Sequence, residues 1–273
     1  MHLLRTPLAL ALVAVGLLTV SHVRAHDLKV GMQTWTLRNL SFEEAMKFCA
    51  EHKIKYVQLT PNHIALNEGK EEWAKRKALI DSLGLVPYTF GVAPSSLVKE
   101  ENRKLFECAK FFGMKLVVVE PNDYKILDNL EELAKEYDIR VIVHNHDIKS
   151  PYGNPLVVRN LLKYRDKRMG VCMDAGWIAS TRLDPTKVFS EYGGRVYDIH
   201  LKDKDVKSTE QGDRWNDTFL GEGDGNLGKL LETIQEAHYD GVIAIETDNN
   251  LKDPTEHTVK ALEFIKKHSK SEH

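Results

Sequence analysis

Four residues with metal-binding side chains each stand at the end of a hydrophobic run: His144, Asp174, His200 and Glu246. A charge that is buried without a partner is costly, so ionisable side chains in such places need a shared partner. One divalent cation would satisfy two carboxylates and two imidazoles together. Mixed ligands of this kind suit Mn, Zn, Co or Fe better than Mg or Ca. These residues therefore predict a transition-metal site.

Each of the four residues also has a simpler structural interpretation. His144 alone is typical of a hydrogen-bonded core histidine, and Asp174 is placed to cap a following helix. His200 could orient a neighbour, and Glu246 could form a structural ion pair with Lys202. All four interpretations would have to coincide at the ends of four consecutive strands, so one shared site is favoured.

The hydrophobic runs themselves have the character of parallel strands. They are short and continuous rather than alternating, as expected for strands that are buried on both faces. Eight such runs occupy residues 29–35, 56–60, 86–90, 116–120, 141–144, 170–174, 196–201 and 242–246.

Segments with helical periodicity follow these runs. The first begins at Ser41, which together with Glu44 predicts a capping box. The others occupy residues 68–83, 98–112, 125–137, 155–164, 185–192, 227–238 and 254–268. Eight strands that alternate with eight helices predict an α/β protein with a single (β/α)₈ TIM barrel, in which catalytic side chains gather at the C-terminal strand ends. A doubly wound open sheet is the alternative, but the glycine fingerprint expected after an early strand is missing.

The first residues have the three-part layout of a secretory signal. Arg5 precedes an apolar run over residues 7–20, and a short polar stretch ends at Ala25. A membrane anchor is the alternative, but the run is shorter than the roughly 20 residues that span a bilayer. We expect a signal peptide at residues 1–25 that is cleaved after Ala25. The barrel, residues 26–273, would then be exported to the periplasm or the extracellular space without stable membrane insertion.

Composition and charge narrow the classes of partner. The chain of 273 residues is 42% hydrophobic and 29% charged, which is typical of a soluble globular protein. Without the leader it has 36 basic and 40 acidic residues, a net charge of −4, so no basic field for nucleic acid is present. Cys49, Cys108 and Cys172 are too few and too scattered for a disulfide scaffold and are expected to be buried free thiols. Nothing in the sequence excludes a homo-oligomer.

Several strand-end motifs carry a family resemblance. The chain resembles the xylose-isomerase-like TIM-barrel superfamily, and in particular its sugar phosphate isomerases/epimerases, over essentially all of the mature chain. The motifs are Met173-Asp174-Ala175-Gly176, Asp198-Ile199-His200-Leu201-Lys202-Asp203, Gly221-Glu222-Gly223 and Ile245-Glu246.

The resemblance implies a metal, often manganese, held by Glu, Asp, His and Glu on strands five to eight. Asp174, His200 and Glu246 match the last three ligands, whereas His144 stands where the family has Glu. Trp177 stands where many members have a histidine.

The resemblance also implies proton removal next to a sugar carbonyl, through an enediolate that the metal stabilises. Glu246 and His144 would act in acid–base catalysis, and His146 or Glu120 would relay the second proton. Lys202 would hold a substrate oxygen.

Other residues are expected to complete the substrate pocket. Candidate walls are Trp35, His63, Glu120 and Trp177. The polar segment 203–225 is interpreted as a lid over the barrel mouth, with Trp215 available to stack on a sugar, or alternatively as a solvated surface loop.

These expectations lead to a metal-dependent isomerase or epimerase of a non-phosphorylated sugar, since free sugar phosphates are mainly intracellular. An exported 3-keto-glycoside lyase, which works by β-elimination at the same site, is an alternative. A non-catalytic sugar-binding barrel is another. A nuclease resembling endonuclease IV is disfavoured, because it needs several metals and a basic groove for DNA.

Overall fold

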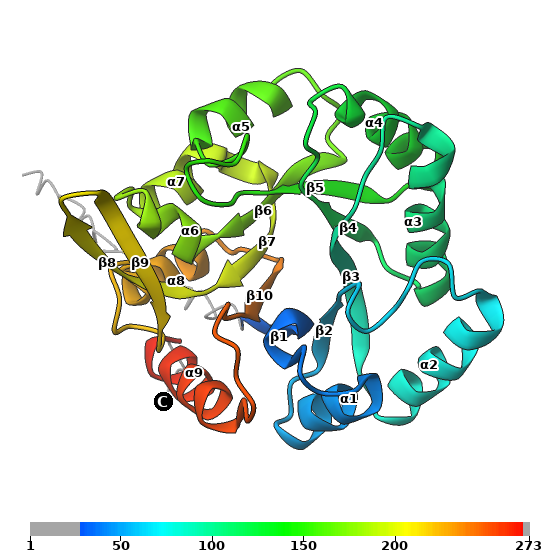
Figure 1. Ribbon diagram of the computed structural model, residues 1–273, viewed down its shortest axis with the longest axis horizontal. Coiled ribbons are helices and arrows are strands. Elements are labelled where there is room, and N and C mark those ends of the chain that lie inside the picture. The colour runs from blue at the N-terminus through cyan, green and yellow to red at the C-terminus, as the bar shows by residue number, and fades with distance from the viewer. Residues whose placement is uncertain (1–27, 270–273) are drawn as a thin grey trace, which may run out of the picture.

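The computed structural model describes residues 28–269, which form a closed barrel of eight parallel strands. The strands lie at the centre of the molecule and the helices surround them (Figure 1). Neighbouring strands follow the order β1-β10-β7-β6-β5-β4-β3-β2. The predicted barrel is therefore confirmed, and the open doubly wound sheet is wrong. The predicted signal peptide lies outside the described residues.

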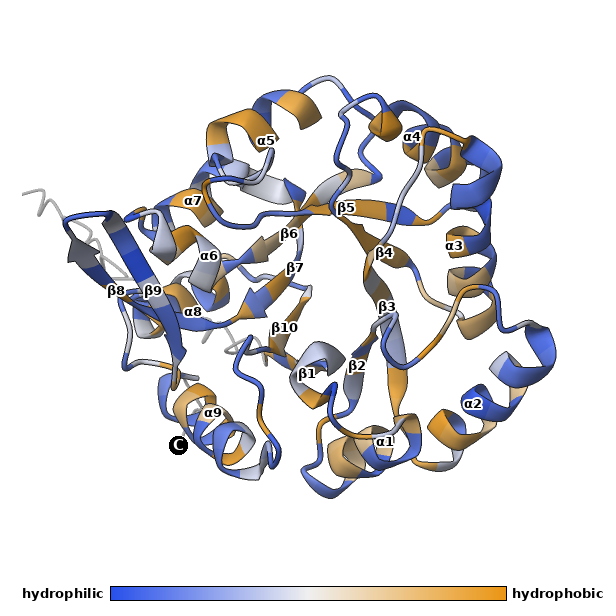
Figure 2. Cartoon of the chain, viewed as in Figure 1, coloured by the Kyte–Doolittle hydropathy of each residue, from blue (hydrophilic) through white to orange (hydrophobic). Residues whose placement is uncertain are grey.

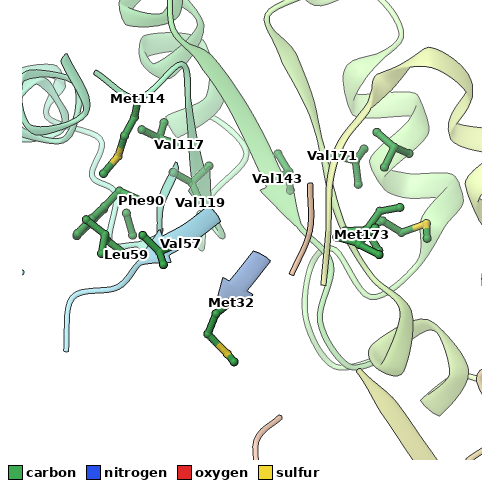
Figure 3. Packing of buried hydrophobic residues seen from close by; sticks show 14 of the residues in the cluster. Met32, Val57, Leu59, Phe90, Met114, Val117, Val119, Val143, Val171 and Met173 are labelled. Carbon is green, nitrogen blue, oxygen red and sulfur yellow. The ribbon is translucent and has the colours of Figure 1, made fainter. Parts of the chain in front are cut away.

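The barrel strands coincide with the eight hydrophobic runs. Their bounds are β1 (Lys29–Gln33), β2 (Tyr56–Leu59), β3 (Val86–Ala93), β4 (Leu116–Val119), β5 (Arg140–His144), β6 (Met169–Asp174), β7 (Val196–Leu201) and β10 (Val242–Ile245). Apolar side chains of neighbouring strands, such as Val57, Phe90 and Val119, pack together in the core (Figure 3). Strand register places Asp174 of β6 directly beside His200 of β7. The register thus brings two candidate ligands to one level of the barrel.

The helices cover the outside of the barrel. They are α1 (Phe42–Glu51), α2 (Lys70–Ser82), α3 (Lys99–Phe112), α4 (Ile126–Tyr137), α5 (Pro155–Leu162), α6 (Ala175–Ser180), α7 (Pro185–Tyr192), α8 (Leu227–Glu236) and α9 (Thr255–His268), with short 3₁₀ turns η1 (Thr34–Leu37) and η2 (Gly193–Arg195). Figure 2 shows hydrophobic residues along the central strands and hydrophilic residues on much of the helical ring. The predicted capping box is confirmed, because Ser41 and Glu44 each accept the other's backbone N–H.

Several element bounds differ from the prediction by a few residues, and three local features near the site differ as well. β1 ends at Gln33 instead of residue 35, because the Gln33 side chain accepts the backbone N–H of Trp35 and begins the turn η1. The short helix α6 was not predicted; the Asp174 side chain caps it by accepting the Trp177 backbone N–H at 2.8 Å. The third feature is the segment after β7.

That segment forms an antiparallel hairpin, β8 (Asp203–Thr209) and β9 (Gly212–Thr218), so its interpretation as a loop is wrong. The Asp203 carboxylate binds the chain segment that follows the hairpin. It accepts backbone N–H groups from Gly221, Gly223 and Gly225 at 2.8, 3.1 and 3.0 Å. One buried carboxylate therefore satisfies donors that would otherwise be left without partners.

Replacing Asp203 by Ala is expected to lower the free energy of unfolding by about 3 kcal/mol, because several buried N–H groups would lose their acceptor. Asp205→Ala is the matched control on the same strand, since the half-exposed Asp205 carboxylate pairs with the exposed Lys207. Urea unfolding of both variants measures the difference. Equal stability of the two variants would contradict the role assigned to Asp203.

Two further expectations concern the described part of the chain. Cys49, Cys108 and Cys172 are buried free thiols, as predicted. Among residues 28–269, no helix combines the length and apolar character needed to cross a bilayer.

Candidate metal centre

The four predicted ligands converge at the C-terminal end of the barrel. His144 ends β5, Asp174 ends β6, His200 lies on β7, and Glu246 directly follows β10. One donor atom from each lies within 4.8 Å of the donor atoms of the others, and all four side chains are buried. Side chains from four different strands therefore form one cluster.

The donor atoms of this cluster lie close to one another without normal hydrogen bonds. His200 Nδ1 lies 2.6 Å from Glu246 Oε2, and His144 Nε2 lies 3.5 Å from Asp174 Oδ2. None of these atoms makes a hydrogen bond of normal geometry. Buried polar atoms without partners are rare in folded proteins. Two imidazole nitrogens and two carboxylate oxygens in this state fit a divalent metal ion.

The simpler interpretations of Asp174 and Glu246 are compatible with such a centre. Asp174 caps α6 with Oδ1 and directs Oδ2 into the cluster. Glu246 pairs with Lys202 through Oε1, at 3.1 Å, while Oε2 faces His200. Each carboxylate thus uses one oxygen for a structural contact and directs the other into the cluster.

Lys202 is a buried cation next to the cluster. Its Nζ lies 2.9 Å from Asp174 Oδ2 and 3.0 Å from Asp248 Oδ2. Burial alone would lower the pKa of Lys202, but the carboxylates around it, Asp174 first, hold that pKa well above its ordinary value. Burial would raise the pKa of Asp174, and Lys202 with His144 outweighs this effect and lowers it to about 2. Both groups are therefore charged at neutral pH.

His144 lies between two carboxylates. Its Nδ1 is 3.6 Å from Glu120 Oε2, on the side away from Asp174, and Ser150 Oγ donates to Glu120 Oε1 at 2.6 Å. Burial would lower the pKa of His144, but Asp174 and Glu120 outweigh it and raise that pKa to about 9. A metal-binding histidine typically has such a carboxylate on its other nitrogen. The Glu120 carboxylate lies beside this outer nitrogen of His144, beyond hydrogen-bond distance.

A pocket of 270 Å³ opens onto the cluster. It brings together six of the predicted site residues, Trp35, Glu120, His144, His146, Trp177 and Glu246, with six that were not predicted, Gln33, Thr60, Pro61, Asn62, Val92 and Asp248. Three of the missed residues, 60–62, follow β2 directly, and Gln33 is the last residue of β1. The rule that places functional side chains at strand ends also applies to these residues. Few of them are ionisable, so the sequence gives no chemical reason to single them out.

Two predicted pocket residues lie elsewhere. His63 does not line the pocket; it is buried, with its Nε2 3.2 Å from the carbonyl oxygen of Leu40. Trp215 lies on the hairpin and packs edge-on against Trp177, at 6.0 Å between ring centroids. Neither position supports the predicted contact with substrate.

Trp177, which lines the pocket, packs against the side chains of His146 and Lys204. The His146 ring lies 4.2 Å from its centroid, and the Lys204 ammonium lies over the same indole at 3.7 Å. Lys204 also pairs with Asp217 of β9, which accepts a hydrogen bond from Thr247 at 2.9 Å. The base of the hairpin is thereby joined to the loop after β10.

A larger cavity of 790 Å³ lies at the opposite end of the barrel. Its walls lie near the starts of strands and in adjoining loops, and they include Tyr56, Tyr88, Tyr197 and Tyr239. None of the four clustered ligands lines it. Catalytic groups of TIM barrels lie at the C-terminal strand ends, so the smaller pocket is the candidate active site.

Comparisons with known proteins agree with this fold. An inosose dehydratase of Clostridium perfringens is 25% identical over 154 residues, which is 51% of this chain and 52% of that relative. The chain thus spans about half the length of the curated relatives it matches. A Parabacteroides distasonis protein of known structure is 30% identical, with a TM-score of 0.69, covering 88% of this chain and 98% of that one.

The 3-keto-D-glucoside 4-epimerase of E. coli has the same fold, with a TM-score of 0.70 at 14% identity, over 88% of this chain and all of that one. Residues 46–268 match the family model of the xylose isomerase-like TIM barrel. The chain belongs to the xylose isomerase-like TIM barrel family.

Proposed function

We propose that this chain is a metal-dependent enzyme that removes the proton α to the carbonyl of a non-phosphorylated sugar and returns it to give an isomer or epimer. The observation that carries the proposal is that His144 and Glu246 belong both to the ligand cluster and to the pocket wall. A small molecule in the pocket would therefore touch the same side chains that hold the cation.

The pocket favours a small uncharged ligand. Its volume of 270 Å³ is slightly below the range of about 300–1,000 Å³ typical of sites for drug-sized molecules, so it suits a single sugar unit. Glu120, Glu246 and Asp248 line it, and no Lys or Arg does. A phosphate group would meet these carboxylates and no lysine or arginine side chain in the pocket lining. Trp35 and Trp177 provide aromatic surfaces for the ring.

Two carboxylates are placed for proton transfer from opposite directions. Glu246 follows β10 and Glu120 follows β4, and these strands lie four positions apart in the ring of eight. Burial would raise the pKa of Glu246, but Lys202 and His200 outweigh it and hold that pKa well below its ordinary value. Glu246 is therefore ionised and able to accept a proton. Glu120 replaces the carboxylate that is missing at position 144 as the second proton carrier: it enters the step protonated and gives its proton to the opposite face of the enediolate, while Glu246 keeps the proton it removed.

The cation, when bound, would stabilise the negative charge that develops on the enediolate oxygen. His144, Asp174, His200 and Glu246 would hold it. Manganese is the proposed ion, with Zn, Co and Fe as alternatives. The Lys202 ammonium, 3.1 Å from Glu246 Oε1, adds a fixed positive charge next to the reacting atoms.

Elimination is the second candidate reaction. It is supported by the inosose dehydratase relatives and by His144, because a lyase needs one base and one acid for the leaving group rather than two matched carboxylates. Both reactions begin with removal of the same α-proton. A 3-keto-glycoside or a cyclitol ketone would be the substrate of the lyase.

Elemental analysis of the purified protein tests the centre. We expect about one transition-metal ion per chain in the wild type, and its loss in His144→Ala and Glu246→Ala, since each variant removes a ligand. His146→Ala is the control, because His146 lines the pocket outside the cluster. A metal-free wild type, or variants that keep the ion, would overturn the proposed centre.

The reaction is tested with free ketoses and 3-keto-glycosides in D₂O, followed by NMR. Incorporation of deuterium next to the carbonyl together with a new epimer supports the isomerase or epimerase. Release of the group β to the carbonyl, with an unsaturated ketone as product, supports the lyase. Sugar binding without exchange, in protein that retains its metal, would leave only the non-catalytic barrel.

A further inference from the structure

His200 has a second ring nitrogen, and its partner is a residue far away in the sequence. His200 Nε2 lies 2.9 Å from the side-chain oxygen of Gln58. Gln58 lies on β2, and its side chain reaches through the barrel interior to β7, three positions away in the ring of strands. Both side chains have no solvent-exposed surface. A polar pair buried this deeply is held in one geometry by its hydrogen bonds.

The orientation of the Gln58 amide follows from its other contact. Gln58 Nε2 lies 2.9 Å from the backbone carbonyl oxygen of Gly91. A carbonyl oxygen only accepts hydrogen bonds, so the NH₂ end of the amide must face Gly91 and the oxygen must face His200. The proton between the two side chains therefore belongs to His200 Nε2.

This assignment determines which nitrogen of His200 can bind a cation. A neutral imidazole with its proton on Nε2 keeps its lone pair on Nδ1. His200 Nδ1 is the atom that faces the cluster, 2.6 Å from Glu246 Oε2. We infer that Gln58 is a positioning residue that fixes the tautomer and ring plane of His200 and so presents Nδ1 to the metal. The inference rests on the cation centre of the proposed function.

If Gln58 is removed, Asp198 is a weaker alternative partner for His200. Asp198 Oδ2 lies 3.6 Å from His200 Nε2, beyond hydrogen-bond distance, and Tyr88 donates to the other Asp198 oxygen at 3.0 Å. Without the Gln58 oxygen, the imidazole is free to turn toward Asp198. The ring would then no longer direct Nδ1 at the centre.

Two substitutions and a control separate this role from general packing. Gln58→Met keeps the length of the side chain and removes the acceptor, whereas Gln58→Glu keeps an oxygen at the same reach. Thr89→Val is the control, because Thr89 is a buried neighbour of Gln58 on β3 whose hydroxyl donates to the Leu116 carbonyl oxygen. Each protein is titrated with Mn²⁺, and free Mn²⁺ is measured by electron paramagnetic resonance.

We expect Gln58→Met to weaken Mn²⁺ binding by about 10–100-fold, the effect usual for a residue that supports a ligand. Gln58→Glu should keep more of the affinity than Gln58→Met, and Thr89→Val should bind as the wild type does. NMR of ¹⁵N-histidine in the metal-free wild type should show a proton on His200 Nε2. That measurement needs no variant to fold.

Wild-type affinity in a folded Gln58→Met variant would overturn the inference, as would a bare Nε2 on His200. Equal losses in Gln58→Met and Thr89→Val would do the same, because they would reflect packing alone. A wild type that binds no Mn²⁺ would instead overturn the proposed centre, and the tautomer would still decide the role of Gln58.

Discussion

Replacing Glu246 by Gln is expected to slow exchange of the substrate α-proton by about 10³-fold at saturating metal. This magnitude lies within the range usual for loss of a general base. The amide keeps the size of the side chain but cannot accept the proton. It also weakens the cation site, since Glu246 Oε2 is one of the clustered donors. The measurement is deuterium incorporation by NMR over a range of Mn²⁺ concentrations.

Glu120→Gln is the matched variant on the opposite strand. It keeps the hydrogen bond from Ser150 and removes the charge beside His144. With Glu246 intact, we expect exchange into the starting sugar to continue while conversion to the epimer falls. A Glu246→Gln variant that exchanges at the wild-type rate would show that another group is the base.

Replacing Lys202 by Met is expected to lower the free energy of unfolding of the metal-free protein by about 3–5 kcal/mol, as for removal of one partner of a buried ion pair. The Lys202 ammonium has 1% side-chain exposure and contacts both Asp174 and Glu246. Without it, two buried carboxylates face each other with no nearby ammonium. Urea unfolding of the metal-free protein measures the loss.

Saturating Mn²⁺ should restore part of that stability, because a cation that binds only the folded state stabilises it. Lys229→Met is the control: Lys229 pairs with Glu232 at the surface at 3.3 Å, and such pairs contribute about 1 kcal/mol or less. A loss in Lys202→Met no larger than in Lys229→Met would show that the carboxylates are satisfied in another way.

The barrel could be predicted because its signals are local and repeated. Continuous apolar runs, a capping box at Ser41 and helix starts such as Asp184-Pro185 each report on their own element. The hairpin 203–218 could not be predicted in this way. Its residues are mostly charged or polar without hydrophobic alternation, and the buried Asp203 carboxylate binds the segment that follows the hairpin.

The ligand cluster could be predicted because parallel strands bring their ends to one level, so chain position implies spatial position. Contacts across the barrel follow no such rule. Gln58 meets His200 over 142 residues of sequence, and only the closed ring of strands makes them neighbours. His63 shows the converse: it follows β2 as a pocket residue would, yet it turns to the Leu40 carbonyl oxygen.

The two halves of the chain contribute different kinds of residue to the pocket wall. The first half of the chain contributes Gln33, Trp35, Thr60, Pro61, Asn62, Val92 and Glu120, and the second half contributes His144, His146, Trp177, Glu246 and Asp248. All four clustered donors come from the second half. Chimeras that take the loops after β1, β2 and β3 from another family member would therefore exchange substrate preference and leave the reacting groups in place.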